Sequence, residues 1–151
     1  MELSGDDLAG IVDLFGGLTR AELDGAVEEL AFKRGDDHDP EAVADAVGAA
    51  LDSYRLVAVG DDPELLVSGP AAFPALPDGA TDLPHIMDVP ERSVDRETAA
   101  EAALAKLAAD ADAALSEDDT ERTATLVDLS YDLETWGPVD AAAIRERLGA
   151  E

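Results

Sequence analysis

The sequence predicts a mainly helical α+β fold, in which three helices and a β-hairpin come first and a helical hairpin with a short final helix comes last. Apolar residues recur every three or four positions through most of the chain, this period is lost between residues 56 and 67, and five prolines interrupt residues 69–92. We therefore expect one compact unit made of a subdomain over 1–68, a Pro-rich extended connection over 69–92 and a helical subdomain over 93–151.

The first two helices are predicted from their start and stop signals. A Ser or Thr followed three residues later by an acidic residue marks a helix start, and Gly marks a helix end. The start residues are Ser4 with Asp7 and Thr19 with Glu22, and the end residues are Gly16 and Gly35. Apolar residues keep helical spacing between these signals, which gives helices over 4–15 and 19–34.

A third helix and a hairpin complete the first part of the chain. Asp39 can cap the helix, Pro40 suits its first position, and apolar residues recur every three or four positions as far as Tyr54. Two apolar runs, Leu56–Val59 and Leu65–Val67, then flank a Gly-Asp-Asp-Pro turn. The order is therefore helix, helix, helix, hairpin.

The Pro-rich segment over 69–92 can be neither a continuous helix nor a central strand. It still contains enough apolar side chains to pack along the rest of the protein as an ordered, extended wrap. These side chains are Phe73, Leu76, Leu83, Ile86, Met87 and Val89.

The last third is predicted to be helical. Asp95 begins a helix whose stripe is mostly Ala and ends near Leu115, and residues 116–119 break it. A second helix carries a narrow seam over Leu126–Trp136, and a short final helix follows the cap Asp140. Because the seam could also be a dimer interface, the oligomeric state stays open.

The composition is strongly acidic. Among 151 residues, 36 Asp and Glu stand against 10 Lys and Arg, which gives a formal net charge of −26. Repulsion on this scale opposes a compact state in dilute buffer, whereas at 1 M salt the Debye length is only about 3 Å. Because 46% of the residues are hydrophobic and periodic, we interpret the chain as a salt-adapted folded protein and not as acidic disorder.

Several classes of protein are excluded or disfavoured. Cysteine is absent, so disulfides, thiolate metal sites and cysteine nucleophiles are excluded. The first seven residues contain neither a basic region nor an apolar run, and no apolar stretch approaches the roughly 18 residues of a membrane span. We therefore expect a cytoplasmic protein with no membrane partner.

The order of three helices and a hairpin resembles a winged helix-turn-helix domain, with residues 39–54 in the position of the recognition helix and 56–67 as the wing. The resemblance implies DNA or a protein as partner. The recognition position carries three acids, Glu41, Asp45 and Asp52, and only Arg55 follows them, which complements phosphate poorly. A protein partner is therefore favoured, and a winged-helix transcription regulator is the alternative.

No catalytic, cofactor-binding or metal-binding residue is assigned, and no cofactor is expected, because Gly-rich phosphate loops and zinc-protease motifs are absent. His85 with Asp88 as its orienting group supports a second alternative, an enzyme. The run Asp-Asp-His-Asp over 36–39 has cation-binding residue types, but it lacks the pattern of a calcium loop. We interpret it as a solvated loop and helix cap.

We interpret Phe73, Tyr131 and Trp136 as core anchors, with a ligand groove as the alternative.

Four stretches resemble a family of acidic proteins from haloarchaea that has no assigned activity. They are Leu14–Leu23, Gly69–Pro77, Asp82–Ile86 and Ser130–Glu134. The resemblance implies a haloarchaeal source and a soluble protein, and it supplies no catalytic residue. From the topology and the absence of a catalytic constellation, we expect a non-enzymatic interaction module, with regulation as one form of its role.

Overall fold

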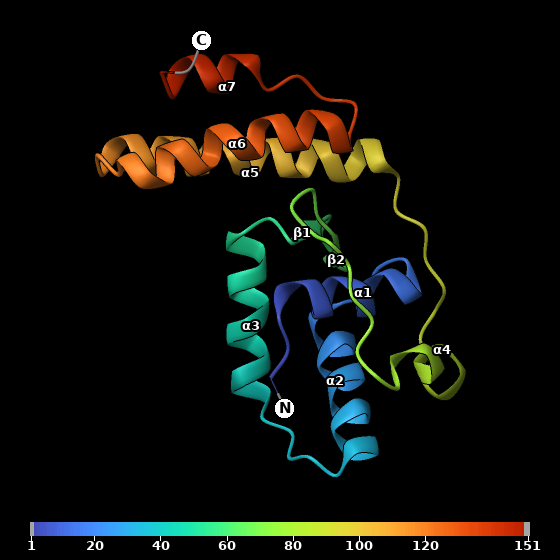
Figure 1. The fold of residues 1–151 in the computed structure, drawn as a ribbon. Helices are drawn as coiled ribbons and strands as arrows, with labels where there is room; N and C mark the ends of the chain where they lie inside the picture. The colour runs from blue at the N-terminus through green and yellow to red at the C-terminus, as the bar shows by residue number, and fades with distance from the viewer. Residues whose placement is uncertain (1, 150–151) are drawn as a thin grey trace. The chain divides into compact units, whose positions relative to one another are not determined.

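A computed structural model describes residues 2–149 (Figure 1), and contacts divide the chain into two compact units, Met1–Val94 and Asp95–Glu151. In chain order the elements are α1 (Gly5–Phe15), α2 (Arg20–Arg34), α3 (Pro40–Asp52), β1 (Leu56–Val59), β2 (Leu65–Ser68), a 3₁₀ turn (Ala80–Asp82), α4 (Leu83–Ile86), α5 (Arg96–Ser116), α6 (Thr120–Trp136) and α7 (Ala142–Arg147). The predicted class, α+β and mainly helical, is confirmed.

The first two helices begin and end at the predicted signals. The side chains of Ser4 and Thr19 each accept a hydrogen bond from the amide three residues later, and the carboxylates of Asp7 and Glu22 accept the return bonds. Gly35 ends α2 with a φ of +71°, a left-handed conformation that glycine adopts without strain. Main-chain amides at the starts of α1 and α2 are thus hydrogen-bonded by side chains within three residues.

The core of the N-terminal unit lies between α1, α2, α3 and the hairpin, since α1 contacts the other two helices and both strands (Figure 1). β1 and β2 are antiparallel, with Leu56 opposite Ser68. Leu18 adds a one-residue bridge to Leu66 between α1 and α2. The largest fully buried side chains include Leu8, Ile11, Leu18, Leu23, Leu30, Leu56, Leu66 and Leu83.

The Pro-rich segment over 69–92 lies within the N-terminal unit, Met1–Val94. Main-chain amides of Phe73 and Ala75 donate to the side chain and the main-chain oxygen of Asp6, each at 3.0 Å. The amide of Arg92 donates to the main-chain oxygen of Phe15 at 3.1 Å. These bonds hold the segment along α1. The segment also contains a short helical part, the 3₁₀ turn and α4, which its prolines had not led us to expect.

Only half of the apolar side chains in this segment pack as expected. Leu83 is buried, and Met87 and Val89 contact the core. The other three are exposed, namely Phe73, Leu76 and Ile86. In α4 the side chain of Leu83 turns into the core and that of Ile86 turns to solvent, since a helix of one turn has one buried face.

In the C-terminal unit, α5 and α6 form a helical hairpin, and α7 contacts both (Figure 1). Small residues of α5 face the predicted Leu seam of α6, and Leu126, Leu129 and Leu133 are buried. Leu115 is 41% exposed and Ala114 is buried in its place, which corrects the predicted end of the stripe. None of the helices within residues 2–149 has both the length and the apolar character that a bilayer crossing requires.

Candidate functional site

A histidine and two carboxylates meet beside the middle of α2. Asp24 and Glu28 are four residues apart on this helix, so their side chains project from one face. Gly35 ends the helix, and the loop after it returns His38 to α2 before Asp39 caps α3. The positions of all three side chains therefore depend on a helix stop and a helix start.

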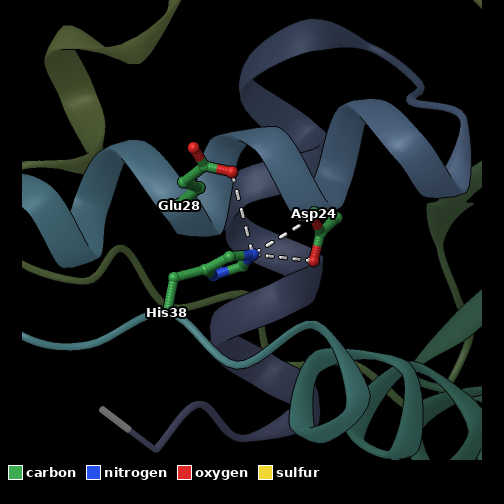
Figure 2. A group of neighbouring side chains, drawn as sticks. All are labelled: Asp24, Glu28 and His38. Carbon is green, nitrogen blue, oxygen red and sulfur yellow. Dashed lines mark hydrogen bonds and ion pairs between the residues drawn. The ribbon is translucent and has the colours of Figure 1, made fainter.

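Nε2 of His38 points toward both carboxylates (Figure 2). It lies 3.1 Å from each carboxylate oxygen of Asp24 and 3.9 Å from Oε2 of Glu28. One ligand-type atom from each residue lies within 4.8 Å of the other two. Although both oxygens of Asp24 are equally near, only Oδ2 has hydrogen-bond geometry toward the ring, and Oδ1 has no hydrogen-bond partner.

Solvent exposure increases across the three side chains, from the His38 ring to the Glu28 carboxylate. The exposed fractions are 15% for His38, 33% for Asp24 and 65% for Glu28. Within residues 2–149, Oδ1 of Asp24 and Nδ1 of His38 are buried without a hydrogen-bond partner. Two carboxylates one turn apart repel by about 0.2–0.5 kcal/mol, so a positive group between them is favoured.

His38 also lines two hollows of the N-terminal unit. One is a cleft of about 750 Å³ between the N-terminal residues, α2 and α3, and its lining includes Asp7, Asp39 and Val43. The other is a hollow of about 320 Å³, and Glu28 and Phe32 line it. The charged groups that line either hollow in the described structure are carboxylates and His38, so neither suits an anionic guest.

A second ionic contact fixes the end of the Pro-rich segment. The Arg92 guanidinium donates to both carboxylate oxygens of Glu22, at 2.6 and 3.2 Å, and also to the main-chain oxygen of Gly17 at 3.2 Å. The hydrogen bond from Arg92 lowers the pKa of Glu22 below its usual 4.5, and the bonds within the capping box lower it further against the opposing effect of burial. Both side chains are about four-fifths buried.

We expect Arg92→Ala to destabilise the N-terminal unit by about 2 kcal/mol at neutral pH, because it leaves a mostly buried carboxylate without its charged partner. Since folding lowers the pKa of Glu22, this stabilisation is complete above pH 4.5 and is lost as the pH falls through the folded-state pKa. Urea unfolding of both proteins at pH 7 and at pH 3 measures the difference.

The difference between wild type and variant should therefore shrink at pH 3, and taking the difference removes the general effect of protonating the other acids. Arg20→Ala is the matched control, because Arg20 and its partner Glu64 are 54% and 40% exposed. It should cost less than about 0.5 kcal/mol. A difference of equal size at both pH values would contradict the role of Glu22.

The structure does not bring the residues of the enzyme hypothesis into a site. His85 and Asp88 are both exposed, and no hydrogen bond joins them within the described residues. The interpretation of 36–39 as a solvated loop and cap fits Asp39, whose side chain accepts hydrogen bonds from two amides at the start of α3. It is wrong for His38, which turns inward to α2.

The aromatic residues are not the core anchors that we expected. Phe73 is 81% exposed and Tyr131 is 47% exposed. Guanidinium groups cover the rings of the C-terminal unit, with Arg145 at 4.2 Å from the centroid of Tyr131 and Arg96 at 4.3 Å from that of Trp136. Cation–π contact therefore holds rings that apolar packing does not enclose.

Asp24 and Glu28 are the two residues of the site that sequence reasoning missed. Their i,i+4 spacing on a helix with clear start and stop signals, 14 and 10 residues before His38, was the available signal. Such spacings are frequent by chance in a chain with 36 acids, so the spacing alone selects no site. The return of the loop after Gly35 is what distinguishes this pair.

In the N-terminal unit three helices precede an antiparallel hairpin, and Leu18, between α1 and α2, forms a one-residue bridge to Leu66 of β2. The chain belongs to a family of unknown function, DUF7109, whose profile matches residues 6–151. Comparison with curated proteins gave no significant match, and neither did comparison with solved structures.

Proposed function

We propose that this protein is a salt-adapted, cytoplasmic interaction module of haloarchaeal origin, with a regulatory role, and that its N-terminal unit binds a protein partner through the exposed end of α2. The observation that carries the proposal is the exposure of Phe32, whose side chain is 83% exposed. We call Glu28, Glu29, Phe32 and Asp36 the Phe32 surface, since they line one hollow.

Phe32 is one of only three phenylalanines in the sequence. Phe15 is 4% exposed, whereas Phe32 and Phe73 are 83% and 81% exposed. Of the two exposed rings, that of Phe32 lines a hollow together with carboxylates. Concentrated salt strengthens the tendency to bury apolar surface, so an open aromatic ring is more costly in the proposed environment than in dilute buffer. Buried aromatic side chains at the centre of an interface commonly dominate its binding energy.

The charges around Phe32 indicate what kind of partner fits. Glu28, Glu29 and Asp36 line the same hollow as the ring, and the two cations at the end of α2, Lys33 and Arg34, make contacts elsewhere. Lys33 contacts Asp82 and Arg34 donates to the main-chain oxygen of Asp78. A partner with an apolar pocket and a basic rim would therefore complement the Phe32 surface.

The helix that carries this surface is rigid, which lowers the entropic cost of binding. Thr19 and Glu22 cap its start and Gly35 caps its end. The opposite face of α2 is buried in the core through Leu23, Ala26, Val27, Leu30 and Ala31. A side chain on such a helix is presented in a fixed direction without ordering a loop.

Two further features favour a protein partner over DNA. The α3 helix, in the recognition position, exposes Glu41 and Asp45, and Arg55 after it contacts Asp6 at 3.4 Å. The turn of the hairpin is acidic as well, with Asp61 and Asp62 exposed. These surfaces would repel phosphate where a winged helix ordinarily meets it.

Phe32→Ala tests the proposal. In lysate at multimolar KCl, the wild-type chain should retain a protein that Phe32→Ala loses, and the purified partner should bind the variant at least about 30-fold more weakly. Phe73→Ala is the matched control, because Phe73 is equally exposed but lies outside the Phe32 surface. Equal retention by wild type and Phe32→Ala, or loss with Phe73→Ala alone, would contradict this surface.

A further inference from the structure

We propose that Asp24, Glu28 and His38 bind one divalent transition-metal ion. This metal site is separate from the proposed binding of a protein partner through Phe32. The donor set combines an imidazole nitrogen with two carboxylates. Imidazole suits zinc, iron, nickel and copper, whereas carboxylate also suits manganese. We therefore expect a site for Zn²⁺ or Mn²⁺, completed by water on the exposed side of Glu28.

The distances between the donor atoms fit such an ion. Metal bonds of about 2.0–2.2 Å to nitrogen and oxygen place neighbouring ligand atoms roughly 3.0–3.5 Å apart. Nε2 of His38 lies 3.1 Å from the Asp24 oxygens, within this range, and 3.9 Å from Oε2 of Glu28. Because the Glu28 side chain is 65% exposed, a small rotation can close the remaining gap.

The burial of the donor atoms separates this cluster from ordinary surface acids. Oδ1 of Asp24 is buried, lies 3.1 Å from Nε2 of His38, and has no hydrogen-bond partner within residues 2–149. A buried carboxylate oxygen without a hydrogen bond is costly, and a metal ion would satisfy it. In the metal-bound form Nε2 is the ligand, and the proton of the neutral ring is on Nδ1.

The site would join parts of the chain that are separated in sequence. Asp24 and Glu28 belong to α2, whereas His38 belongs to the loop that leads into α3. Bound metal would fix this loop and would offset the repulsion between the two carboxylates. Glu28 also lines the Phe32 surface, so metal would change the charge that a partner meets there.

Calorimetric titration of the metal-stripped chain with Zn²⁺, at high KCl and with excess Mg²⁺ to occupy exposed carboxylates, tests the proposal. We expect one saturable site. His38→Ala and Asp24→Asn should each raise its Kd by at least about tenfold. His85→Ala and Glu29→Gln are the matched controls, since His85 is the second histidine of the chain and Glu29 is the neighbour of Glu28 on α2, and both should leave the Kd within about twofold.

A second measurement needs no variant. Because the chain has two histidines, paramagnetic Mn²⁺ at one equivalent should broaden the ring protons of His38 far more strongly than those of His85. The proposal is overturned if neither Zn²⁺ nor Mn²⁺ binds saturably, if folded His38→Ala binds as tightly as wild type, or if Mn²⁺ broadens both histidines equally. Partner binding through Phe32 would be unaffected by such a failure, because its test uses a different residue.

Discussion

Gly10→Ala is expected to destabilise the N-terminal unit by about 2–3 kcal/mol. Gly10 lies within α1 against the Pro-rich segment, and a Cβ there would be 1.8 Å from the main-chain oxygen of Ala75. That oxygen belongs to the residue whose amide donates to Asp6, so the segment must move away from α1 as a whole. Thermal unfolding by circular dichroism measures the loss, and hydrogen exchange at the amides of Phe73 and Ala75 should accelerate.

Gly48→Ala is the matched control for this substitution. Gly48 also lies within a helix, α3, but a Cβ there would meet nothing within 4 Å. The helical preference of Ala over Gly should therefore stabilise the protein by about 0.5–1 kcal/mol. If both substitutions had the same sign and size, the contact between α1 and the Pro-rich segment would not be the cause.

Removal of salt is expected to unfold the protein, with a midpoint below about 1 M KCl. The reason is the net charge of −26, which ion pairs cannot neutralise. Eight of the ten Lys and Arg residues already pair with a carboxylate within residues 2–149. Most acids are therefore screened by mobile ions alone. Circular dichroism during stepwise dialysis from 3 M KCl measures the transition.

Two comparisons separate screening from other effects of concentrated salt. Sucrose at equal osmolarity should not replace KCl, because it screens no charge. Glu41→Gln with Asp45→Asn, both exposed on α3, should lower the midpoint, because the variant carries two fewer negative charges. Retention of the complete fold in salt-free buffer would contradict salt adaptation.

The elements of the fold could be predicted because their signals are local. The capping box of Thr19 and Glu22, the stop at Gly35 and the proline after Asp39 each act over three or four residues. The hairpin could be predicted for the same reason, since its two strands are separated by a short turn. In each case hydrogen bonding near the residue itself is sufficient to choose the conformation.

The candidate site could not be predicted, because its parts meet only after folding. His38 looked like one polar residue of an acidic loop, and nothing in its neighbourhood indicated that it turns toward Asp24. Phe73 was expected to anchor the core, and nothing in the sequence indicated the exposure of Phe32. Both side chains are more than 80% exposed. Which face of an element meets the core is decided by the elements that pack on it.

Caps, turns, periodicity and composition depend on neighbouring residues or on none, and they set the mainly helical class, the ends of α1 and α2 and the strong negative charge. They did not indicate the 3₁₀ turn or α4. Tertiary structure alone decided that the Pro-rich segment joins the N-terminal unit, that Arg92 meets Glu22, and that a histidine lies between two carboxylates of α2. Those contacts join residues 10 to 77 positions apart, from His38 with Glu28 to Arg92 with Phe15, and only packing of the whole unit selects them in a chain with 36 acids.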